Sequence, residues 1–412
     1  MISLSHINLI RQWLFIAMFS FPVIPIKFIN VFFIVFSIIT LFLFIKEKPK
    51  WIISDFKYYL IFIVPFIPYL IEFVLFPTNS IIQFEVEKKL LFFIAPISFY
   101  MNSLLNHKIK AYHAINCFIS SVAILSIISF FYLVFSGNLF SVSSYQNGAF
   151  ELRKSFEEIS GQHPIYFGLF CSTASLWVIY AFDQYSKELK WLLGISLFFM
   201  ITLNFLIAAK MPLLIFIVGV LWIAFKKVEN KKRLIIFYSL FFVSLFLMVE
   251  FIPSLNNRLS EVIGFFDNVS NNNTILERYV VFNCSKMVFV QDFLTGIGIR
   301  NTQNLLDFCY VYFKFYKGYS IHLNSHNQYL TLGISYGIGI LLVFITCLYV
   351  LYKLIKNNPY AIIYLTSSTL IMLTESILER QMGIYFFLFF GLLFLLPFQS
   401  KYNTKANINS AK

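Results

Sequence analysis

Three basic residues at the ends of long apolar runs could take part in chemistry: Lys210, Arg278 and His326. A lysine or an arginine can hold a phosphate, and an arginine can do so through two parallel hydrogen bonds. Histidine titrates near neutral pH, so it can take a proton from an attacking hydroxyl group. The set therefore indicates a transfer reaction in which an anionic leaving group is neutralised without a metal.

His326 opens an apolar helix in the stretch LNSHNQYLTLGISYGIG. A single histidine at a helix end is more often a cap than a catalytic group. The residues around it favour catalysis because they form a dense polar cluster: Asn324, Ser325, Asn327 and Gln328. Within this cluster we expect Asn327 to contact the substrate. Three glycines downstream would permit close contact with another helix: Gly333, Gly337 and Gly339.

Arg278 follows Glu277 in the stretch TILERYVVF. One alternative is an intrahelical or surface ion pair, which would carry little energetic weight. The functional alternative is a guanidinium group that grips a diphosphate. Downstream, the stretch GIGIRN places Arg300 after a two-glycine turn whose backbone N–H groups could face the same anion. We expect Arg300 to bind substrate there.

Other charged residues are weaker candidates. Lys210 interrupts the apolar stretch NFLIAAKMPLLIF, either as a lysine that reaches the membrane interface or as a contact to a substrate phosphate. Arg153 and His163 lie in an earlier polar segment and are further candidate substrate contacts. The stretch TESILERQMG contains three charges that we expect only to pair with one another: Glu375, Glu379 and Arg380.

Several motifs that would indicate other chemistry are missing from the sequence. There is no HExxH, GxSxG, P-loop or DxD signature, which argues against ATP-driven transport and against a metal-dependent sugar-nucleotide transferase. The five cysteines show no metal-binding spacing, and we expect neither a metal nor a cofactor. Cys284 and Cys309 share one polar segment, where a disulfide is allowed outside the cytoplasm, but two free thiols are the favoured prediction.

The composition is that of a membrane protein. Hydrophobic residues make up 59% of the 412 residues and charged residues only 12%, against about 25% charged in soluble domains. The net charge of +13 is spread over short clusters between apolar runs, as in membrane topology signals, so we do not expect a nucleic-acid partner. We interpret the first apolar run as a spanning helix and not as a removed signal peptide.

The apolar runs predict an all-α transmembrane bundle with about 12 spans, since one span needs roughly 20 apolar residues. They cover about 9–26, 28–45, 58–76, 89–106, 112–136, 164–183, 190–208, 211–226, 234–252, 327–352, 359–378 and 383–399. We interpret 1–400 as a single membrane domain and 401–412 as a cytoplasmic tail.

Every second break between the runs carries Lys or Arg, which predicts that both termini are cytoplasmic. Two longer polar segments, 137–163 and 253–325, then lie outside the cytoplasm. The longer one contains ILERYVVFNCSKMVFVQDFL, whose spacing predicts an amphipathic helix at the membrane surface.

The order of these features resembles the O-antigen ligase and O-antigen polymerase superfamily of bacterial inner membranes. Many spans are followed by a long late outside segment, ERYxxF, GIG and SHNQYLxxxxxxG. The most specific piece is His326-Asn327, followed after nine residues by Gly337. Gly339 arrives one position early for the rest of that signature, and Lys210 stands where the family often has Arg.

The resemblance implies an inverting, metal-independent glycosyltransferase at the periplasmic face of the inner membrane. A glycan linked to undecaprenyl diphosphate would be the donor and the lipid A-core, or another glycan, the acceptor. Arg278, with Lys210, would hold the diphosphate. His326 would orient or deprotonate the acceptor hydroxyl. No nucleotide is needed, because the diphosphate bond carries the driving energy.

Two alternatives stay open at this level. A polymerase of the same superfamily would pass the growing polymer to a single repeat unit, whereas a ligase, which we favour, passes the finished polymer to the core. A lipid-linked oligosaccharide flippase belongs to a different class. It would show two similar halves, short loops and charges deep inside a cavity, whereas the ionisable residues here gather at the outer ends of the runs.

Overall fold

The computed structural model describes residues 4–50, 52–105, 109–141, 146–251, 256 and 274–409. The described residues form α-helices and short 3-10 helices without a strand, which confirms the predicted all-α class. The chain divides into two compact units. The first unit contains Met1–Phe19, Ile26–Ile115 and Glu277–Lys412, and the second unit contains Ser20–Pro25 and Asn116–Leu276.

The helices of each unit follow one another with short connections. The first unit is built from α1 (Leu4–Ala17), η1 (Met18–Ser20), α2 (Ile26–Glu47), α3 (Ile53–Phe56), α4 (Leu60–Ile63), η2 (Val64–Phe66), α5 (Ile67–Leu75), α6 (Ser80–Lys89), α7 (Leu91–Leu104), α15 (Thr274–Gln291), α16 (Ile299–Tyr312), α17 (Tyr316–Ser320), α18 (Gln328–Ile355), α19 (Pro359–Ile371), η5 (Ile377–Glu379) and α20 (Gln381–Asn409). The second unit is built from α8 (Ala111–Phe135), α9 (Gln146–Ser160), α10 (Pro164–Ala181), η4 (Phe182–Gln184), α11 (Lys187–Ile207), α12 (Lys210–Lys227) and α13 (Lys231–Phe251).

Five helical segments among the described residues are long and apolar enough to cross a membrane. They are Ile26–Glu47, Ala111–Phe135, Pro164–Gln184, Lys187–Ile207 and Gln328–Ile355. Each coincides with a predicted span. The predicted run 58–76 instead forms α4, η2 and α5 in succession, because Pro65 and Pro68 interrupt the helical hydrogen bonding. The count of twelve spans and the single membrane domain stay predictions.

Aromatic side chains fill the core of the first unit. Phe15 of α1 lies with its ring centroid 5.4 Å from that of Phe36 on α2 and 5.2 Å from that of Phe99 on α7. The Phe99 ring also lies 5.9 Å from that of Phe389 on α20. Such aromatic pairs add to the stabilisation that comes from burying apolar surface. They tie α1, α2, α7 and α20 into one packed layer.

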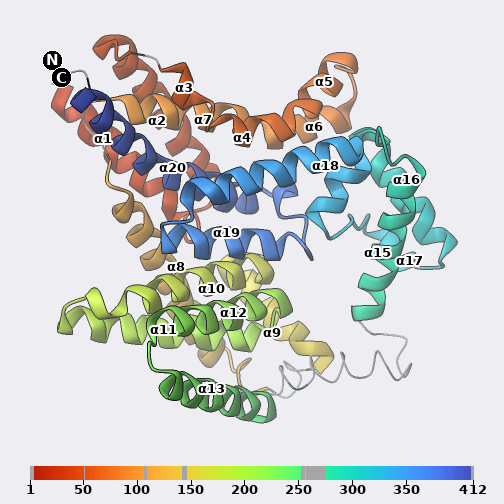
Figure 1. Cartoon of the computed structure of the whole chain (residues 1–412). Coiled ribbons are helices and arrows are strands. Elements are labelled where there is room, and N and C mark those ends of the chain that lie inside the picture. Colours follow the sequence, from red (N-terminus) through yellow and green to blue (C-terminus); the bar gives the residue numbers. More distant parts are fainter. Residues whose placement is uncertain are drawn as a thin grey trace. The chain divides into compact units, whose positions relative to one another are not determined.

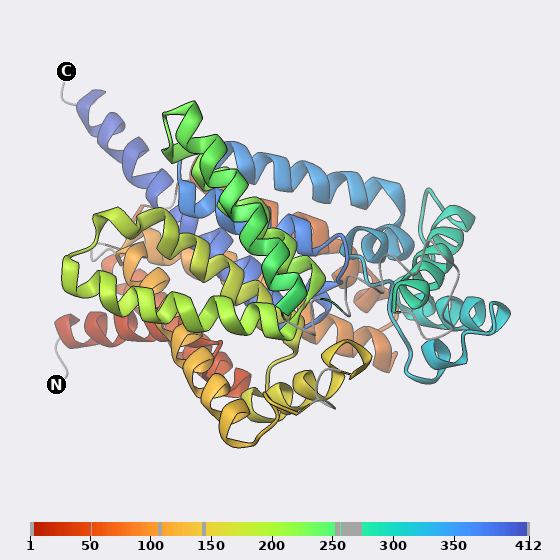
Figure 2. The same cartoon turned by 90° about the horizontal axis from the view of Figure 1, so that it is seen from below.

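The helix α18 is interrupted at Gly337, where the backbone has φ 75° and ψ 178°. The connection between α15 and α16 occupies this break. Ile297 donates its N–H to the carbonyl of Ile334 at 3.0 Å, and Ile338 donates to Phe293 at 2.8 Å. A β-carbon at Gly337 would lie 2.2 Å from the Leu294 oxygen, so only glycine fits. Figure 1 and Figure 2 show α15, α16 and α17 gathered at the N-terminal part of α18.

The three glycines of α18 therefore act differently from one another. Gly333 permits the close helix contact that was predicted, because a β-carbon there would lie 2.9 Å from the Phe289 ring of α15. Gly337 breaks the helix instead. A β-carbon at Gly339 would meet no atom of the described residues within 4 Å, so these residues do not make the predicted close contact there.

The helix α15 confirms the predicted helix in the late outside segment. Its buried face holds Val281, Cys284 and Val288, which pack against α16 and α18. Tyr279 and Phe282, from the predicted apolar face, are about half exposed. An exposed apolar face of this kind suits a helix at a membrane surface.

A disulfide joins Cys284 of α15 to Cys309 of α16. The prediction of two free thiols is wrong, because α15 and α16 pack side by side and bring the two sulfur atoms together in a small apolar core. Sequence spacing alone could not show this contact, since 25 residues separate the cysteines.

Breaking this disulfide should destabilise the α15–α16 pair. Cys284→Ser should lower the free energy of unfolding by about 2–4 kcal/mol, because the cross-link limits the unfolded chain. Thermal unfolding in detergent measures the loss, with Cys347→Ser, a free cysteine on α18, as the matched control. Alkylation of the denatured protein should label three thiols without reductant and all five after reduction. Five labelled thiols without reductant would contradict the disulfide.

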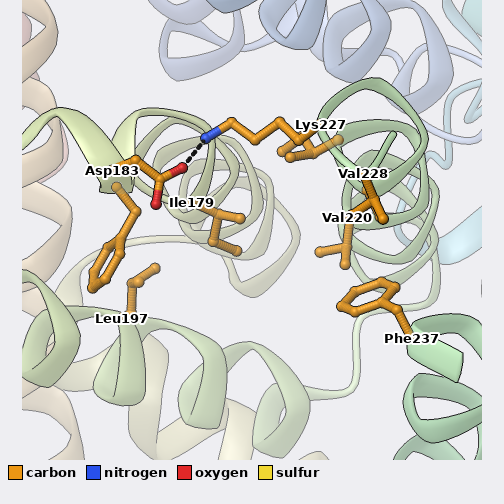
Figure 3. Close-up of a pocket in the computed structure, with 10 residues that line it drawn as sticks. Ile179, Asp183, Leu197, Val220, Lys227, Val228 and Phe237 are labelled. Atoms are coloured by element: carbon orange, nitrogen blue, oxygen red, sulfur yellow. Dashed lines mark hydrogen bonds and ion pairs between the residues drawn. The ribbon is translucent and has the colours of Figure 1, made fainter. Parts of the chain in front are cut away.

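In the second unit, α10 packs closely on α12 where glycines leave room for the neighbouring helix. A chain of hydrogen bonds also joins α11, α10 and α12. Asn204 of α11 donates to the Ser172 hydroxyl at 2.9 Å, and Ser172 donates to the Pro212 carbonyl at 2.7 Å. A pocket of about 390 Å³ lies among α10, α11, α12 and α13. Figure 3 shows its apolar walls and the ion pair of Lys227 with Asp183 at 2.8 Å. None of the predicted site residues lines this pocket.

Candidate functional site

The polar cluster before α18 anchors that helix to the connection between α19 and η5. Asn327 caps α18, because its side-chain oxygen accepts the Leu330 N–H at 3.0 Å. Its amide nitrogen donates to the Leu373 carbonyl at 2.9 Å. Both ends of the Asn327 amide are thus engaged within the protein, so the structure gives this predicted substrate contact a capping role. The backbone N–H of Gln328 donates to Met372 at 2.9 Å and adds to the same junction.

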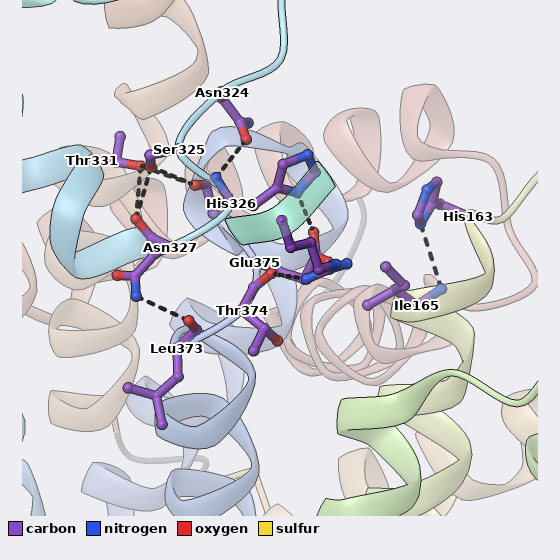
Figure 4. Close-up of polar contacts among 12 residues, drawn as sticks. His163, Ile165, Asn324, Ser325, His326, Asn327, Thr331, Leu373, Thr374 and Glu375 are labelled. Carbon is purple, nitrogen blue, oxygen red and sulfur yellow. Dashed lines mark hydrogen bonds and ion pairs between the residues drawn. The ribbon is translucent and has the colours of Figure 1, made fainter. Parts of the chain in front are cut away.

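His326 stands immediately before this cap in a left-handed backbone conformation, with φ 45°. Such a conformation is uncommon for a residue with a β-carbon and persists only where the surroundings enforce it. Asn324 contributes by accepting the His326 backbone N–H at 3.0 Å. The strained backbone directs the imidazole towards the α19–η5 connection (Figure 4).

The centre of the site is Glu375, which contacts both predicted catalytic residues. Its Oε2 lies 3.2 Å from Nδ1 of His326, and its Oε1 lies 2.6 Å from Nη2 of Arg278. Arg278 also donates from Nη1 to the Thr374 carbonyl at 2.8 Å. The side chain of Glu375 is 11% exposed, whereas those of His326 and Arg278 are 30% and 44% exposed. The structure therefore brings together His326, from the start of α18, and Arg278, from α15, on the carboxylate of Glu375.

The pKa of Glu375 reflects this position. Burial by itself raises the pKa of the carboxyl group, because it disfavours the charged form. The hydrogen bond with His326 and the charges of Arg278 and His326 more than offset burial, so the pKa lies below its ordinary value. Glu375 is consequently an anion at neutral pH.

The pairing of His326 with an anion defines what its imidazole can do. With a carboxylate at Nδ1, the neutral ring carries its proton on Nδ1 and its lone pair on Nε2. A carboxylate that fixes the tautomer and the ring orientation is the arrangement that supports a histidine base. The site can thus accept a proton at Nε2 and stabilise the imidazolium that forms.

Arg278 keeps part of its hydrogen-bonding capacity. Of the five N–H donors of a guanidinium group, one each is used by Glu375 and by Thr374. The remaining donors and the partly exposed side chain leave room for an anionic ligand. Arg278 does form an ion pair, as the alternative predicted, but with Glu375 and not with its neighbour Glu277, which pairs with Lys317 of α17 at 2.7 Å.

A second layer of polar contacts holds the α19–η5 connection in place. The Thr331 and Ser376 hydroxyl oxygens lie 2.9 Å apart, and the side-chain oxygen of Gln328 accepts the Leu378 N–H at 2.8 Å. Beneath them, the fully buried Lys89 of α6 pairs with Glu379 at 2.8 Å. Breaking a buried pair leaves an uncompensated charge, so this contact fixes the connection that carries Glu375.

Two expectations for this region are corrected. Glu375 and Glu379 were expected to pair with Arg380, but they pair with Arg278 and His326 and with Lys89, respectively. The GIGIRN turn was expected to present N–H groups to an anion. The N–H groups of its two glycines instead donate to the carbonyls of Asp292 and Ser335, both at 2.9 Å.

Arg300 lies in the first turn of α16, where its guanidinium stacks on the Phe76 ring at 3.9 Å. The adjacent Ile299 N–H donates to the buried carboxylate of Glu72 at 3.1 Å. Among the contacts that the structure describes, Arg300 does not join the Glu375 cluster. Its predicted role in substrate binding stays a prediction.

The other predicted substrate contacts belong to the second unit. Arg153 of α9 donates to the carbonyls of Ile207 and Ala208, both at 2.7 Å, and so caps the end of α11. Lys210 begins α12 two residues later and is exposed. His163 caps α10, because its Nδ1 accepts the Ile165 N–H at 3.4 Å. The structure thus brings Arg153 to the turn before Lys210 and gives Arg153 and His163 capping roles.

Glu375 is the residue that sequence reasoning missed as part of the site. Its contacts with His326 and Arg278 span 49 and 97 residues of sequence, so no local pattern indicates them. The available signal was a carboxylate between two apolar helices, where a charge needs a partner.

No protein-family model matches the chain, and no curated protein matches it.

Proposed function

We propose that this chain is a membrane glycosyltransferase that moves a glycan from a polyprenyl diphosphate to an acceptor hydroxyl. Within this class we propose an O-antigen ligase that uses undecaprenyl diphosphate as carrier and the lipid A-core as acceptor. The observation that carries the proposal is the His326–Glu375–Arg278 cluster. It joins a histidine, whose Nδ1 contacts a buried carboxylate, to the cation of Arg278 on the same carboxylate.

In the proposed reaction, Nε2 of His326 takes the proton of the acceptor hydroxyl while the oxygen attacks the anomeric carbon. The bond from this carbon to the diphosphate oxygen breaks, and the electron pair leaves with the diphosphate. Attack opposite the leaving group inverts the anomeric centre. The free N–H donors of Arg278 stabilise the charge that develops on the diphosphate. Glu375 stabilises the imidazolium ion until the proton is released.

The proposal includes a topology with twelve spans, both termini in the cytoplasm, and 137–163 and 253–325 in the periplasm of a bacterial inner membrane. Two observations support it. The disulfide of Cys284 with Cys309 lies in the second of these segments, and disulfides persist in oxidising compartments such as the periplasm. The His326–Glu375–Arg278 cluster is built from residues of the predicted outer ends of helices.

Deletion of the gene in its native strain tests the proposed function. We expect surface lipopolysaccharide that consists of bare core, together with long polymer that accumulates on the lipid carrier. Gel electrophoresis of the lipopolysaccharide beside the extracted lipid-linked pool measures both. A plasmid copy of the wild-type gene should restore the ladder, and an empty plasmid serves as the control.

The same gel separates the alternatives. Core that carries a single repeat unit would identify a polymerase and contradict the ligase. An unchanged ladder with no accumulated lipid-linked glycan, in a strain with one copy of the gene, would contradict both. Bare core together with lipid-linked glycan that accumulates only on the cytoplasmic face would instead indicate a flippase.

A further inference from the structure

A pocket of about 250 Å³ lies in the first unit next to the proposed site. Its walls come from α6, α16, the segment before α18 and η5. Asn324 and Ser325 line it, and His326 is the next residue along the chain. Asn324 also accepts the backbone N–H of His326, so the pocket wall and the position of the imidazole are directly connected.

The charges around this pocket balance one another. Lys88 pairs with Glu85 on α6, and the buried Lys89 pairs with Glu379 of η5. The remaining cation that lines the pocket is Arg380, and the remaining carboxylate behind it is Asp307. Lys88 and Lys89 attract an anion weakly, because their ion pairs largely cancel their fields. The pocket therefore suits a neutral, polar ligand better than a phosphate.

The pocket also offers hydrogen-bonding groups of both kinds. Oε2 of Glu85 is a buried acceptor that lies 3.9 Å from Nζ of Lys89 and accepts no hydrogen bond from the described residues. The side-chain amide of Asn324 and the guanidinium of Arg380 supply donors. A buried acceptor without a hydrogen bond is costly, so a donor from a ligand would stabilise it. Ile81, Ile299 and Leu306 add an apolar wall.

A second histidine is fixed at this pocket in the same way as His326. His322 lines the pocket, and its Nδ1 lies 2.6 Å from Oδ2 of Asp307. Asp307 is buried and also accepts from Gln303 at 2.8 Å. His322 has a left-handed backbone as well, with φ 48°. Two strained histidines, four residues apart and each in contact with a buried carboxylate, thus lie in the segment before α18.

We propose that this pocket binds a sugar ring of a glycan substrate beside His326. Sugar hydroxyls both donate and accept hydrogen bonds, and the C–H groups of the ring are apolar, which matches the mixed lining. His322 is a positioning residue that holds a hydroxyl through the ring nitrogen opposite Asp307. The inference rests on the proposed function for the identity of the glycan, which comes either from the acceptor or from the lipid-linked donor.

Equilibrium binding to the purified full-length protein in detergent tests the pocket without requiring transfer. Two probes distinguish the sources: core oligosaccharide freed of lipid A, and repeat-unit oligosaccharide freed of its diphosphate carrier. The variants are His322→Ala, which removes a hydrogen bond, and Ile81→Trp, which fills the pocket from an exposed position. The matched controls are Tyr312→Ala on the exposed face of α16 and Val74→Trp on the exposed face of α5.

We expect one probe to bind the wild-type protein and both controls with the same Kd. His322→Ala should weaken that binding by about tenfold, which is the effect of losing one good polar contact. Ile81→Trp should weaken it by about tenfold or more, because the indole ring occupies the space of the ligand. Weaker binding of the core probe identifies the acceptor site, and weaker binding of the repeat-unit probe identifies the donor site. The pocket proposal is overturned if neither probe binds, or if pocket variants and controls bind alike. The deletion gel reports on the proposed function independently of this result.

Discussion

Replacing His326 with alanine should reduce glycan transfer by a factor of about 10²–10⁴, the range for loss of a general base. The protein should still fold, because the imidazole is partly exposed and the cap of α18 is supplied by Asn327. Alanine retains a β-carbon, so the strain of the left-handed backbone at φ 45° is the same in the variant and the wild type. The initial rate of polyprenyl diphosphate release in reconstituted vesicles measures the effect.

A second substitution separates a base from an orienting group. His326→Gln retains a side chain that can hydrogen-bond to Glu375 but cannot take a proton. If His326 is the base, the glutamine variant should be as slow as the alanine variant. His113→Ala, an exposed histidine at the start of α8, is the matched control and should transfer at the wild-type rate. Normal transfer by His326→Ala would remove this residue from the mechanism.

Glu375→Gln should lower the turnover rate by about 10²–10⁴-fold, as when the orienting carboxylate of a catalytic histidine becomes an amide. Glutamine preserves the size of the side chain but can donate to Nδ1, which favours the wrong tautomer of His326. It also removes the anion that holds Arg278 at 2.6 Å. The effect should appear in kcat more than in KM, because the carboxylate acts on the base and not on the bound glycan.

The matched control for this change is Glu277→Gln. Glu277 precedes Arg278 and forms a surface pair with Lys317, so its loss should cost about 0–1 kcal/mol of stability. The same vesicle assay should give a rate within about twofold of the wild type for this control. Equal rates for both glutamine variants would show that Glu375 does not orient the base.

The lowered pKa of Glu375 sets the pH range of its contribution to stability. A depressed pKa means that the ion pairs stabilise the fold at pH values above the ordinary carboxyl pKa. That stabilisation is lost as the pH falls through the lowered pKa. Loss of transfer on mild acidification above the ordinary carboxyl pKa therefore cannot come from protonation of Glu375.

The helices could be predicted from sequence because their signals are local. Continuous apolar runs identified α10 and α18 within a few residues, and the clustered polar residues before α18 marked a junction. Gly337 shows the limit of such reasoning. Its spacing indicated helix packing, but the glycine is needed because the connection before α16 lies against the backbone of α18.

The site could be predicted only in part for the same physical reason. His326 and Arg278 were identified by residue type and position, whereas Glu375 joins them through contacts across 49 and 97 residues. The pair of Lys89 with Glu379 spans 290 residues, and the disulfide depends on how α15 packs against α16. Contacts of this kind follow from tertiary packing, which a local pattern does not encode.

The central claim is tested most directly by the wild-type protein itself, purified and reconstituted in lipid vesicles with a polyprenyl-diphosphate-linked glycan and a lipid A-core acceptor. We expect free polyprenyl diphosphate to appear only when the acceptor is present, at a rate that EDTA does not change. The same assay with His326→Ala should show almost none. Absence of acceptor-dependent release from the wild-type protein would contradict the proposed glycan transfer.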